Sequence, residues 1–293
     1  MLFAKKKRIL LWLQGGLGNR LRAIEAAIVF SEKTGARLDI IWPETPEMVA
    51  PYQELLKTTS FFNLVEEPFS VRLLNYLIRK KQPFMVSIYR KLMPFKVTML
   101  DHEVAAYKDR YGELQPLLSQ DSVFLRTNHP VDHFERRFNW VEPVSHLAAK
   151  LAEYQWVFKQ FERVVGVHVR RTDHGWAIAN SSDELFFNYM YRELRDHPNA
   201  VFFLFTDNED TEKLYCSQFG EKIIHRPKKY GRDTVEATQD GLIDWLLLSQ
   251  CQVIMHSYWS SFSYTASFKN GALLMEMSEN NLANLESLWP ATE

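Results

Sequence analysis

The chain has 293 residues, of which 46% are hydrophobic and 24% are charged. These fractions are typical of globular proteins and argue against a disordered chain, a fibrous repeat or a small disulfide scaffold. No apolar segment approaches the roughly 20 residues that cross a bilayer, and the first residues carry no signal-peptide cleavage site. We therefore expect a cytoplasmic protein, and the length allows two domains of about 150 residues each.

The net charge is −1, but basic and acidic residues are distributed unevenly. Residues 1–145 contain 21 basic and 16 acidic residues, and residues 146–293 contain 14 and 20. The balanced total disfavours a nucleic-acid binder. A basic stretch at 72–96 mixes cations with large apolar residues, which indicates either a helical hairpin that packs on the first domain or a peripheral contact with a membrane surface or an acidic acceptor. Its seven cations are Arg72, Arg79, Lys80, Lys81, Arg90, Lys91 and Lys96.

The amino-terminal segment predicts a βαβ unit. An apolar run at 8–14 is followed by a glycine cluster, by a helical pattern at 19–33 and by a second apolar run at 36–42. Eight prolines between residues 43 and 130 break the following segment into short pieces, so only one further strand, at 123–127, is predicted there.

The carboxyl-terminal half predicts a doubly wound parallel sheet, because five short strand patterns alternate with helical patterns. We place the boundary between the lobes within 140–162, which gives an α/β protein with Rossmann-like domains at 1–150 and 151–293. The predicted strands are 164–169, 200–205, 221–225, 253–256 and 272–277, and the predicted helices are 183–195, 209–219, 237–250 and 260–269.

The glycine cluster, which includes Gly16, Gly18 and Asn19, lies between the first strand and the first helix. Glycines there let a ligand approach the backbone, and the helix N-terminus offers N–H groups to an anion. As a dinucleotide-binding motif the cluster is defective, because Leu21 occupies a position that requires a small residue and Asp39 lies inside an apolar run. The alternative is a turn that only packs helix against strand.

A second cluster, His168-Val-Arg170-Arg171-Thr-Asp173, follows the strand at 164–169. Two arginines at the carboxyl end of a strand need an anionic partner, and guanidinium groups match phosphate oxygens, so a diphosphate satisfies both. The alternative for the arginines is a salt bridge between the lobes or an exposed pair. For His168 alone, we favour the interpretation of a buried histidine bonded to the backbone.

The two clusters, together with the segment 240–254 and the serine run Ser260-Ser261-Phe262-Ser263, resemble motifs of the α-1,2-, α-1,6- and protein O-fucosyltransferase superfamily. The resemblance implies a GT-B fold of two facing Rossmann-like lobes. It also implies transfer of fucose from GDP-fucose to a glycan or lipid-linked saccharide with inversion, without a metal ion or another cofactor.

The resemblance also implies roles for individual residues. Arg170 holds the β-phosphate of GDP, His168 and Arg171 shape the same pocket, and Asp244 contacts the guanine. Ser260 and Ser261 add hydrogen bonds to the nucleotide, and Asn19 lines the donor from the opposite lobe. Asp207 is expected at a helix start near the donor pocket rather than in a metal site.

Two features depart from the family pattern. No glutamate follows the arginine motif closely, so the candidate bases are Asp173, His174 or an acid of the first lobe. Tyr258 and Trp259 precede the serine run, and Tyr264 follows it, so the acceptor is not identified. Two other functions fit the same residues: transfer of another sugar from its nucleotide, or non-catalytic binding of a nucleotide sugar.

Overall fold

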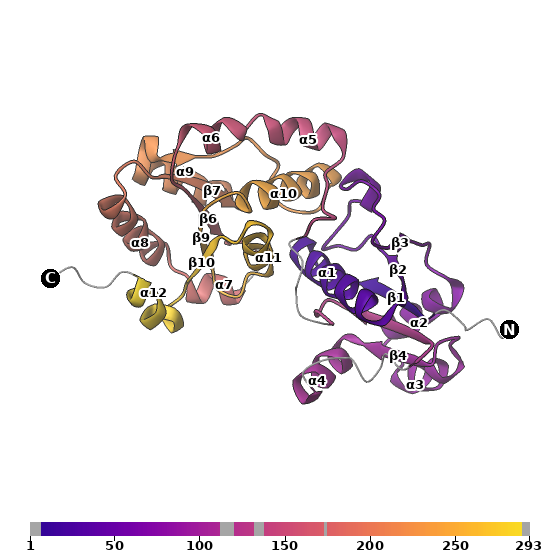
Figure 1. Ribbon diagram of the computed structural model, residues 1–293. Helices are drawn as coiled ribbons and strands as arrows, with labels where there is room; N and C mark the ends of the chain where they lie inside the picture. Colours follow the sequence, from indigo (N-terminus) through magenta and orange to yellow (C-terminus); the bar gives the residue numbers. More distant parts are fainter. Residues whose placement is uncertain (1–6, 112–119, 132–137, 173–174, 289–293) are drawn as a thin grey trace. The chain divides into compact units, whose positions relative to one another are not determined.

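The computed structural model describes residues 7–111, 120–131, 138–172 and 175–288 (Figure 1). The chain divides into two compact units, each with its own sheet. No helix in these described ranges combines the length and apolar character needed to span a bilayer. The first unit comprises Met1–Tyr52 and Thr58–Trp140, and the second comprises Gln53–Lys57 and Val141–Glu293.

The boundary at residues 140 and 141 lies earlier than the expected boundary at 150. Helix α5 (Ser145–Ala152) packs against α10 (Val235–Leu248) and therefore belongs to the second unit. The short segment Gln53–Lys57 joins the same unit, because Leu56 forms a β-bridge with Pro143.

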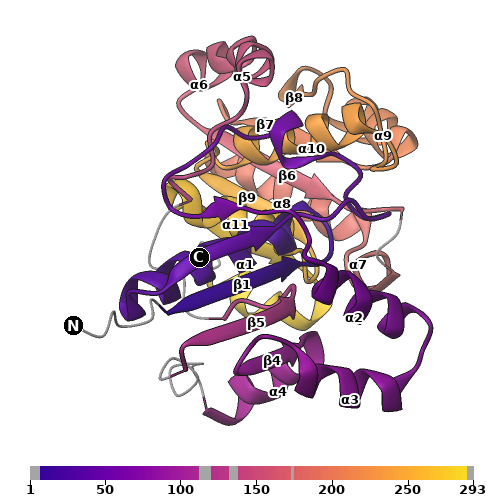
Figure 2. The same ribbon diagram turned by 90° about the vertical axis from the view of Figure 1, so that its right-hand side faces the viewer.

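The first unit contains a parallel sheet with the strand order β3-β2-β1-β5-β4. Helix α1 (Leu17–Thr34) packs against β1 and β2, and helices α2 (Phe69–Arg79) and α3 (Pro83–Leu92) form a hairpin that shares a core with the sheet (Figure 2). The helical hairpin predicted for the basic stretch is thus confirmed. The strands are β1 (Arg8–Leu13), β2 (Arg37–Ile41), β3 (Asn63–Leu64), β4 (Val97–Leu100) and β5 (Ser122–Thr127).

The second unit contains a parallel sheet with the strand order β10-β9-β6-β7-β8. Helices α8 and α12 lie on one side of this sheet and α10 and α11 on the other (Figure 1). Gly166 lets α10 approach β6 closely, because a Cβ there would lie 2.5 Å from Leu248 Cδ1. The strands are β6 (Val164–Val169), β7 (Val201–Thr206), β8 (Ile223–Ile224), β9 (Val253–Ser257) and β10 (Leu273–Met277). The helices include α7 (Gly175–Asn180), α8 (Asp183–Asp196), α9 (Glu209–Phe219), α11 (Ser261–Asn270) and α12 (Leu282–Leu288).

All strands predicted from the sequence are present, and the α/β class with parallel sheets is confirmed. Strands β3 and β4 were not predicted. Strand β3 has only two residues, and β4 lies in the segment where prolines interrupt the patterns. Helix α4 (Asp101–Tyr111), which connects β4 to β5, carries a weak apolar pattern and was also not predicted.

Candidate functional site

The carboxyl end of the second sheet brings several of the predicted residues together. Among the strands of this sheet, β6 comes first along the chain but lies in the middle, with β7 on one side and β9 on the other. The connections that leave the carboxyl ends of β6 and β9 therefore run to opposite sides, toward β7 and β10, and this topological switch point is where open α/β sheets bind ligands. Arg170 follows β6, Asp207 follows β7 and Ser260 follows β9.

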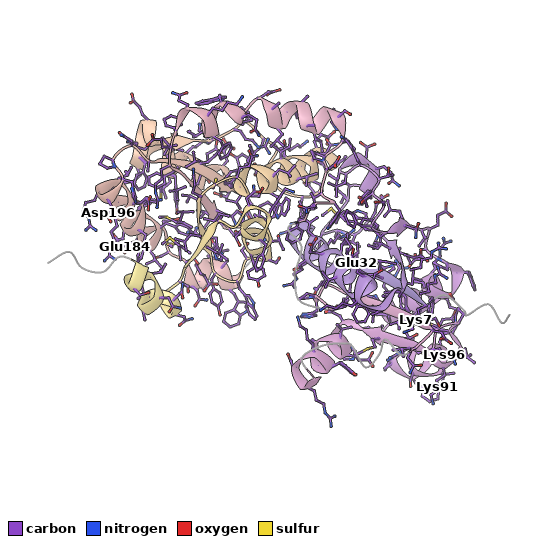
Figure 3. The ribbon with its side chains drawn as sticks, in the orientation of Figure 1. Lys7, Glu32, Lys91, Lys96, Glu184 and Asp196 are labelled. Carbon is purple, nitrogen blue, oxygen red and sulfur yellow. The ribbon has the colours of Figure 1, made fainter. Side chains whose placement is uncertain are left out.

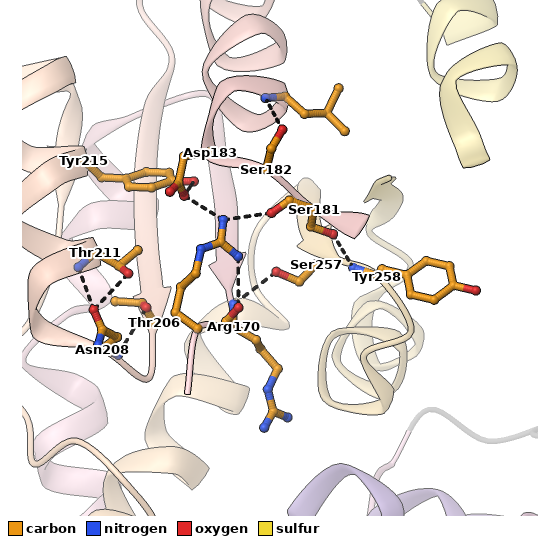
Figure 4. Close-up of polar contacts among 12 residues, drawn as sticks. Arg170, Ser181, Ser182, Asp183, Thr206, Asn208, Thr211, Tyr215, Ser257 and Tyr258 are labelled. Carbon is orange, nitrogen blue, oxygen red and sulfur yellow. Dashed lines mark hydrogen bonds and ion pairs between the residues drawn. The ribbon is translucent and has the colours of Figure 1, made fainter. Parts of the chain in front are cut away.

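Arg170 has a fixed backbone and a partly exposed side chain. Its backbone N–H donates to Ser257 Oγ at 3.0 Å, which ties the exit of β6 to β9. Its Nε lies 3.7 Å from Asp207 Oδ2, and its side chain is 19% exposed. Figure 4 shows the guanidinium pointing away from the polar cluster around Asp183. A cation in this position at the switch point is suited to an anionic ligand.

Arg171 differs from the expectation that one diphosphate engages both arginines. Its guanidinium donates to the carbonyl oxygens of Arg170 at 2.9 Å and Ser181 at 2.8 Å, and to Asp183 Oδ1 at 2.6 Å (Figure 4). The side chain is only 13% exposed. Arg171 thus holds the β6 exit against the start of α8, and it shapes the site by positioning its neighbour.

Asp207, at the end of β7, accepts hydrogen bonds from the segment that follows β6. Its Oδ1 accepts from the Arg171 backbone N–H at 2.8 Å, and its Oδ2 accepts from Thr172 Oγ1 at 2.8 Å. The next residue, Asn208, caps α9 by accepting from the Thr211 N–H at 2.8 Å, so the predicted helix start is confirmed. Across the part of the chain that the structure describes, no group of three or more His, Cys, Asp or Glu residues is arranged to hold a metal ion.

His168 is buried on the face of β6 that meets α11. Its Nδ1 lies 2.5 Å from Ser263 Oγ, and its ring stacks on Phe262 with centroids 4.9 Å apart. Burial, followed by the charge of Arg170, lowers the pKa of His168 well below 6.5, so the ring is neutral at neutral pH. The partner is a side-chain hydroxyl rather than the backbone.

The N-terminus of α11 lies at the carboxyl end of β9. Ser260 caps this helix by accepting from the Ser263 N–H, and Ser261 is its first residue. Trp259, directly before the cap, has a φ of +55° and is 67% exposed. A tryptophan held in the left-handed region costs about 1–3 kcal/mol. The sequence motif contained Trp259, but nothing in the sequence indicated this conformation.

Asp244 lies on α10 in an ion-pair cluster that was not predicted. Its Oδ1 accepts from Arg226 Nε at 2.7 Å, and its Oδ2 accepts from Lys228 Nζ at 2.7 Å. Arg226 also donates to Asp240 Oδ1 at 2.9 Å. Burial alone would lower the pKa of Arg226, but Asp244 and Asp240 raise it. The charge of Lys228 also contributes to the lowered pKa of His168, after burial and the charges of Arg170 and His256. The i, i+4 spacing of the two aspartates was the available sequence signal.

The glycine motif lies in the first unit. Gly16 is the N-cap residue of α1, without a side-chain cap, and Gly18 and Asn19 lie in the first turn. Gly15 has a φ of +71°, and a Cβ there would lie 2.7 Å from Asn19 Nδ2. The adjacent Arg20 is buried, which lowers its pKa to about 9.

Asp39 is a structural residue of β2. Its buried carboxylate accepts from Arg8 Nε at 2.6 Å, Arg37 Nε at 2.8 Å and Asn63 Nδ2 at 3.1 Å. These bonds occupy the carboxylate within the first unit, which agrees with the rejection of a dinucleotide motif.

The second unit therefore unites His168, Arg170, Arg171, Asp207, Ser260, Ser261 and Asp244, whereas Gly16, Gly18 and Asn19 belong to the first unit. Asp173 and His174, two of the candidate bases, lie outside the described residues.

Several solved structures similar to this chain are fucosyltransferases. The NodZ α-1,6-fucosyltransferase soaked with GDP-fucose aligns with 90% of this chain and 92% of its own, with a TM-score of 0.60 and 17% identity. NodZ from Bradyrhizobium gives a TM-score of 0.61 with 17% identity over 89% of this chain and 92% of its own.

Two further enzymes have the same fold. An Arabidopsis thaliana FUT1 mutant in complex with GDP gives a TM-score of 0.62 at 11% identity over 93% of this chain and 70% of its own. POFUT1 in complex with GDP-fucose gives 0.55 at 10% identity over 94% and 99%. No protein-family model and no curated protein sequence matches this chain. At these identities the similarity establishes the fold, and it confirms the predicted GT-B fold class.

Proposed function

We propose that the protein is a glycosyltransferase that transfers fucose from GDP-fucose to a glycan or glycoconjugate acceptor, with inversion at the anomeric carbon and without a metal ion. The position of Arg170 at the switch point of a fold shared with enzymes solved in the presence of GDP-fucose or GDP carries this proposal.

The diphosphate is the leaving group of this reaction. Cleavage of the anomeric bond places additional negative charge on the β-phosphate, so a fixed cation there stabilises the transition state more than the ground state. Arg170 supplies that cation, and the N–H groups at the start of α11 supply the positive end of a helix dipole. Removal of one such preorganised donor costs about 100- to 1,000-fold in rate in other enzymes.

Asp244 is proposed to read the guanine. Its two oxygens already accept hydrogen bonds from Arg226 and Lys228. Each carboxylate oxygen has two lone pairs, so both oxygens can also accept from the N–H groups of guanine. The two cations fix the orientation of the Asp244 carboxylate. Ser260 and Ser261 are proposed as further hydrogen-bonding residues for the nucleotide.

A base must accept the proton of the acceptor hydroxyl. His168 is unsuited to this role, because it is buried, has a lowered pKa and is bonded to Ser263 through Nδ1. Asp173, the last residue of the arginine motif, lies two positions after Arg171 in the sequence and is proposed as the base. Two alternative functions remain. Without a competent base, the protein would bind a nucleotide sugar without turnover. With a different donor, it would transfer another sugar, and Arg170 would bind the diphosphate of that donor.

A donor panel separates these functions. GDP-fucose, GDP-mannose and UDP-glucose are each tested for thermal stabilisation and for slow hydrolysis by the wild-type protein, by Arg170→Lys and by Arg195→Lys. Arg195 is an exposed arginine at the end of α8 and serves as the matched control. We expect hydrolysis of GDP-fucose alone, loss of hydrolysis in Arg170→Lys because lysine cannot bridge two phosphate oxygens, and no change in Arg195→Lys. Stabilisation without hydrolysis indicates a binding protein, and hydrolysis of another donor identifies a different sugar.

A further inference from the structure

The α2–α3 hairpin carries apolar side chains on both of its faces. Toward the sheet, Val71, Leu74 and Val86 are buried in the core of the first unit. On the opposite face of α2, Phe69 is 76% exposed and Tyr76 is 50% exposed. An ordinary surface helix has polar residues on the side that faces away from its core. The hairpin therefore has an apolar surface that the first unit does not cover.

Helix α3 shows this second apolar surface most clearly. Phe84, Ile88 and Leu92 follow one another at intervals of four residues, so they lie in one row. Their exposed fractions are 74%, 43% and 73%, and Met85 beside them is 46% exposed. Six of the fifteen large hydrophobic residues that are exposed within the described ranges belong to this hairpin, which indicates an interaction surface rather than scattered exposure. We call the exposed residues of α2, α3 and their flanks, within 69–96, the hairpin face.

The hairpin face is also strongly basic. The segment 69–96 contains seven cations and no acidic residue. One cation, Arg90, is bonded to Glu103 and to the carbonyl oxygen of Thr98. The other six are exposed, and no salt bridge from them to a described residue is present; Figure 3 labels Lys91 and Lys96 on the outer surface of the first unit. These six are Arg72, Arg79, Lys80, Lys81, Lys91 and Lys96.

We propose that the hairpin face docks peripherally on the surface of an anionic lipid bilayer. The aromatic and aliphatic side chains enter the headgroup region, and the lysines and arginines contact anionic headgroups, as interfacial helices do. A second copy of this chain fits less well, because a two-fold contact through the same face would place six cations against six cations. A nucleic acid would satisfy the charges but would leave the aliphatic row of α3 without a partner.

The expected affinity follows from the charges and the apolar row. Each basic group near an anionic surface changes the partition coefficient about five-fold at low ionic strength, so neutralising three of them lowers binding on the order of 100-fold. The electrostatic part weakens as salt shortens the Debye length. The inference does not rest on the proposed function, since it concerns the first unit and needs no donor sugar.

Co-sedimentation with vesicles tests the proposal with the full chain. Vesicles of phosphatidylcholine with one quarter phosphatidylglycerol are compared with pure phosphatidylcholine at low and high salt. The charge variant is Arg79→Gln, Lys80→Gln and Lys81→Gln, and the apolar variant is Phe84→Ser, Ile88→Ser and Leu92→Ser. The matched controls lie in the second unit: Lys150→Gln, Lys159→Gln and Lys213→Gln for charge, and Trp156→Ser, Tyr191→Ser and Leu214→Ser for exposed apolar residues.

We expect binding to the anionic vesicles only, a loss of about 100-fold in the charge variant, a loss of at least ten-fold in the apolar variant, and little change in the controls. Circular dichroism of each variant verifies that it is folded. Equal binding of both vesicle types, equal losses in the controls, or no binding by the wild-type chain overturns the proposal. Dimerisation abolished by the apolar variant would assign the face to a second copy, and binding of an oligonucleotide without vesicle binding would assign it to nucleic acid.

Discussion

Arg170 and Arg171 are adjacent in the sequence, yet we expect replacement of Arg171 by alanine to reduce mainly stability and replacement of Arg170 to reduce mainly GDP binding. Arg171 makes three side-chain hydrogen bonds within the second unit, one of them to the carboxylate of Asp183. Arg170 directs its guanidinium away from that cluster, and its Nε forms an ion pair with Asp207 Oδ2 at 3.7 Å. Arg170 is thus placed to bind a ligand, whereas Arg171 stabilises the fold.

The magnitudes follow from these contacts. A hydrogen bond that involves a charged group contributes about 1.5–3 kcal/mol, and solvent at the partly exposed Asp183 reduces the total, so Arg171→Ala is expected to lower the free energy of unfolding by about 3 kcal/mol. Arg170→Ala is expected to lower it by at most about 1 kcal/mol. Loss of a charge-assisted contact to a phosphate weakens GDP binding by about 100-fold or more in Arg170→Ala.

Urea unfolding gives the stabilities of both variants, and titration calorimetry with GDP gives the affinities. Calorimetry is done at a temperature where both proteins are fully folded, so that stability and binding are read separately. A strongly destabilised Arg170→Ala, or an Arg171→Ala variant with unchanged stability and abolished GDP binding, would refute the assignment of the two roles.

Three further outcomes are expected. Burial lowers the pKa of His256 to about 4, below the value of about 6.5 in the unfolded chain, so the unfolded state binds more protons between these values. His256 should therefore contribute a fall of about 2 kcal/mol in the free energy of unfolding from pH 7 to pH 5, in addition to the fall that buried His168 contributes in the same direction. Urea unfolding of a His256→Asn variant should show a pH dependence smaller by that amount, and a variant that keeps the full slope would contradict this cause. A chelator should leave fucosyl transfer unchanged; loss of transfer that Mg²⁺ or Mn²⁺ restores would argue against a cation supplied by Arg170. Gly15→Ala should lower the melting temperature, because its φ of +71° and the contact of a Cβ with Asn19 cost about 1–3 kcal/mol; an unchanged melting temperature would show that the turn adapts.

The sequence by itself determined the amino-terminal βαβ unit, the alternation of the main strands and helices from residue 164 onward, and the strand end that the arginine motif follows. Alternation of apolar strands with amphipathic helices is a local pattern, and the parallel topology that it specifies brings strand ends together. The strand pattern alone therefore placed Arg170 and Asp207 at the carboxyl ends of predicted strands, whereas the roles of His168 and Ser260 came from the family resemblance. The segment 43–140 was less predictable, because β3 and β4 are short and depend on pairing with β2 and β5.

Only the tertiary structure decided what each polar side chain contacts. Two arginines in one motif look equivalent in the sequence, but the approach of α8 to the exit of β6 gives Arg171 partners within the fold and leaves Arg170 directed away from them. Arg226 and Lys228 reach Asp244 from a loop that precedes α10, at a separation that no local pattern reveals. Hydrogen bonds and ion pairs act over about 3 Å in space regardless of distance along the chain, so such partners are fixed by packing and not by sequence spacing.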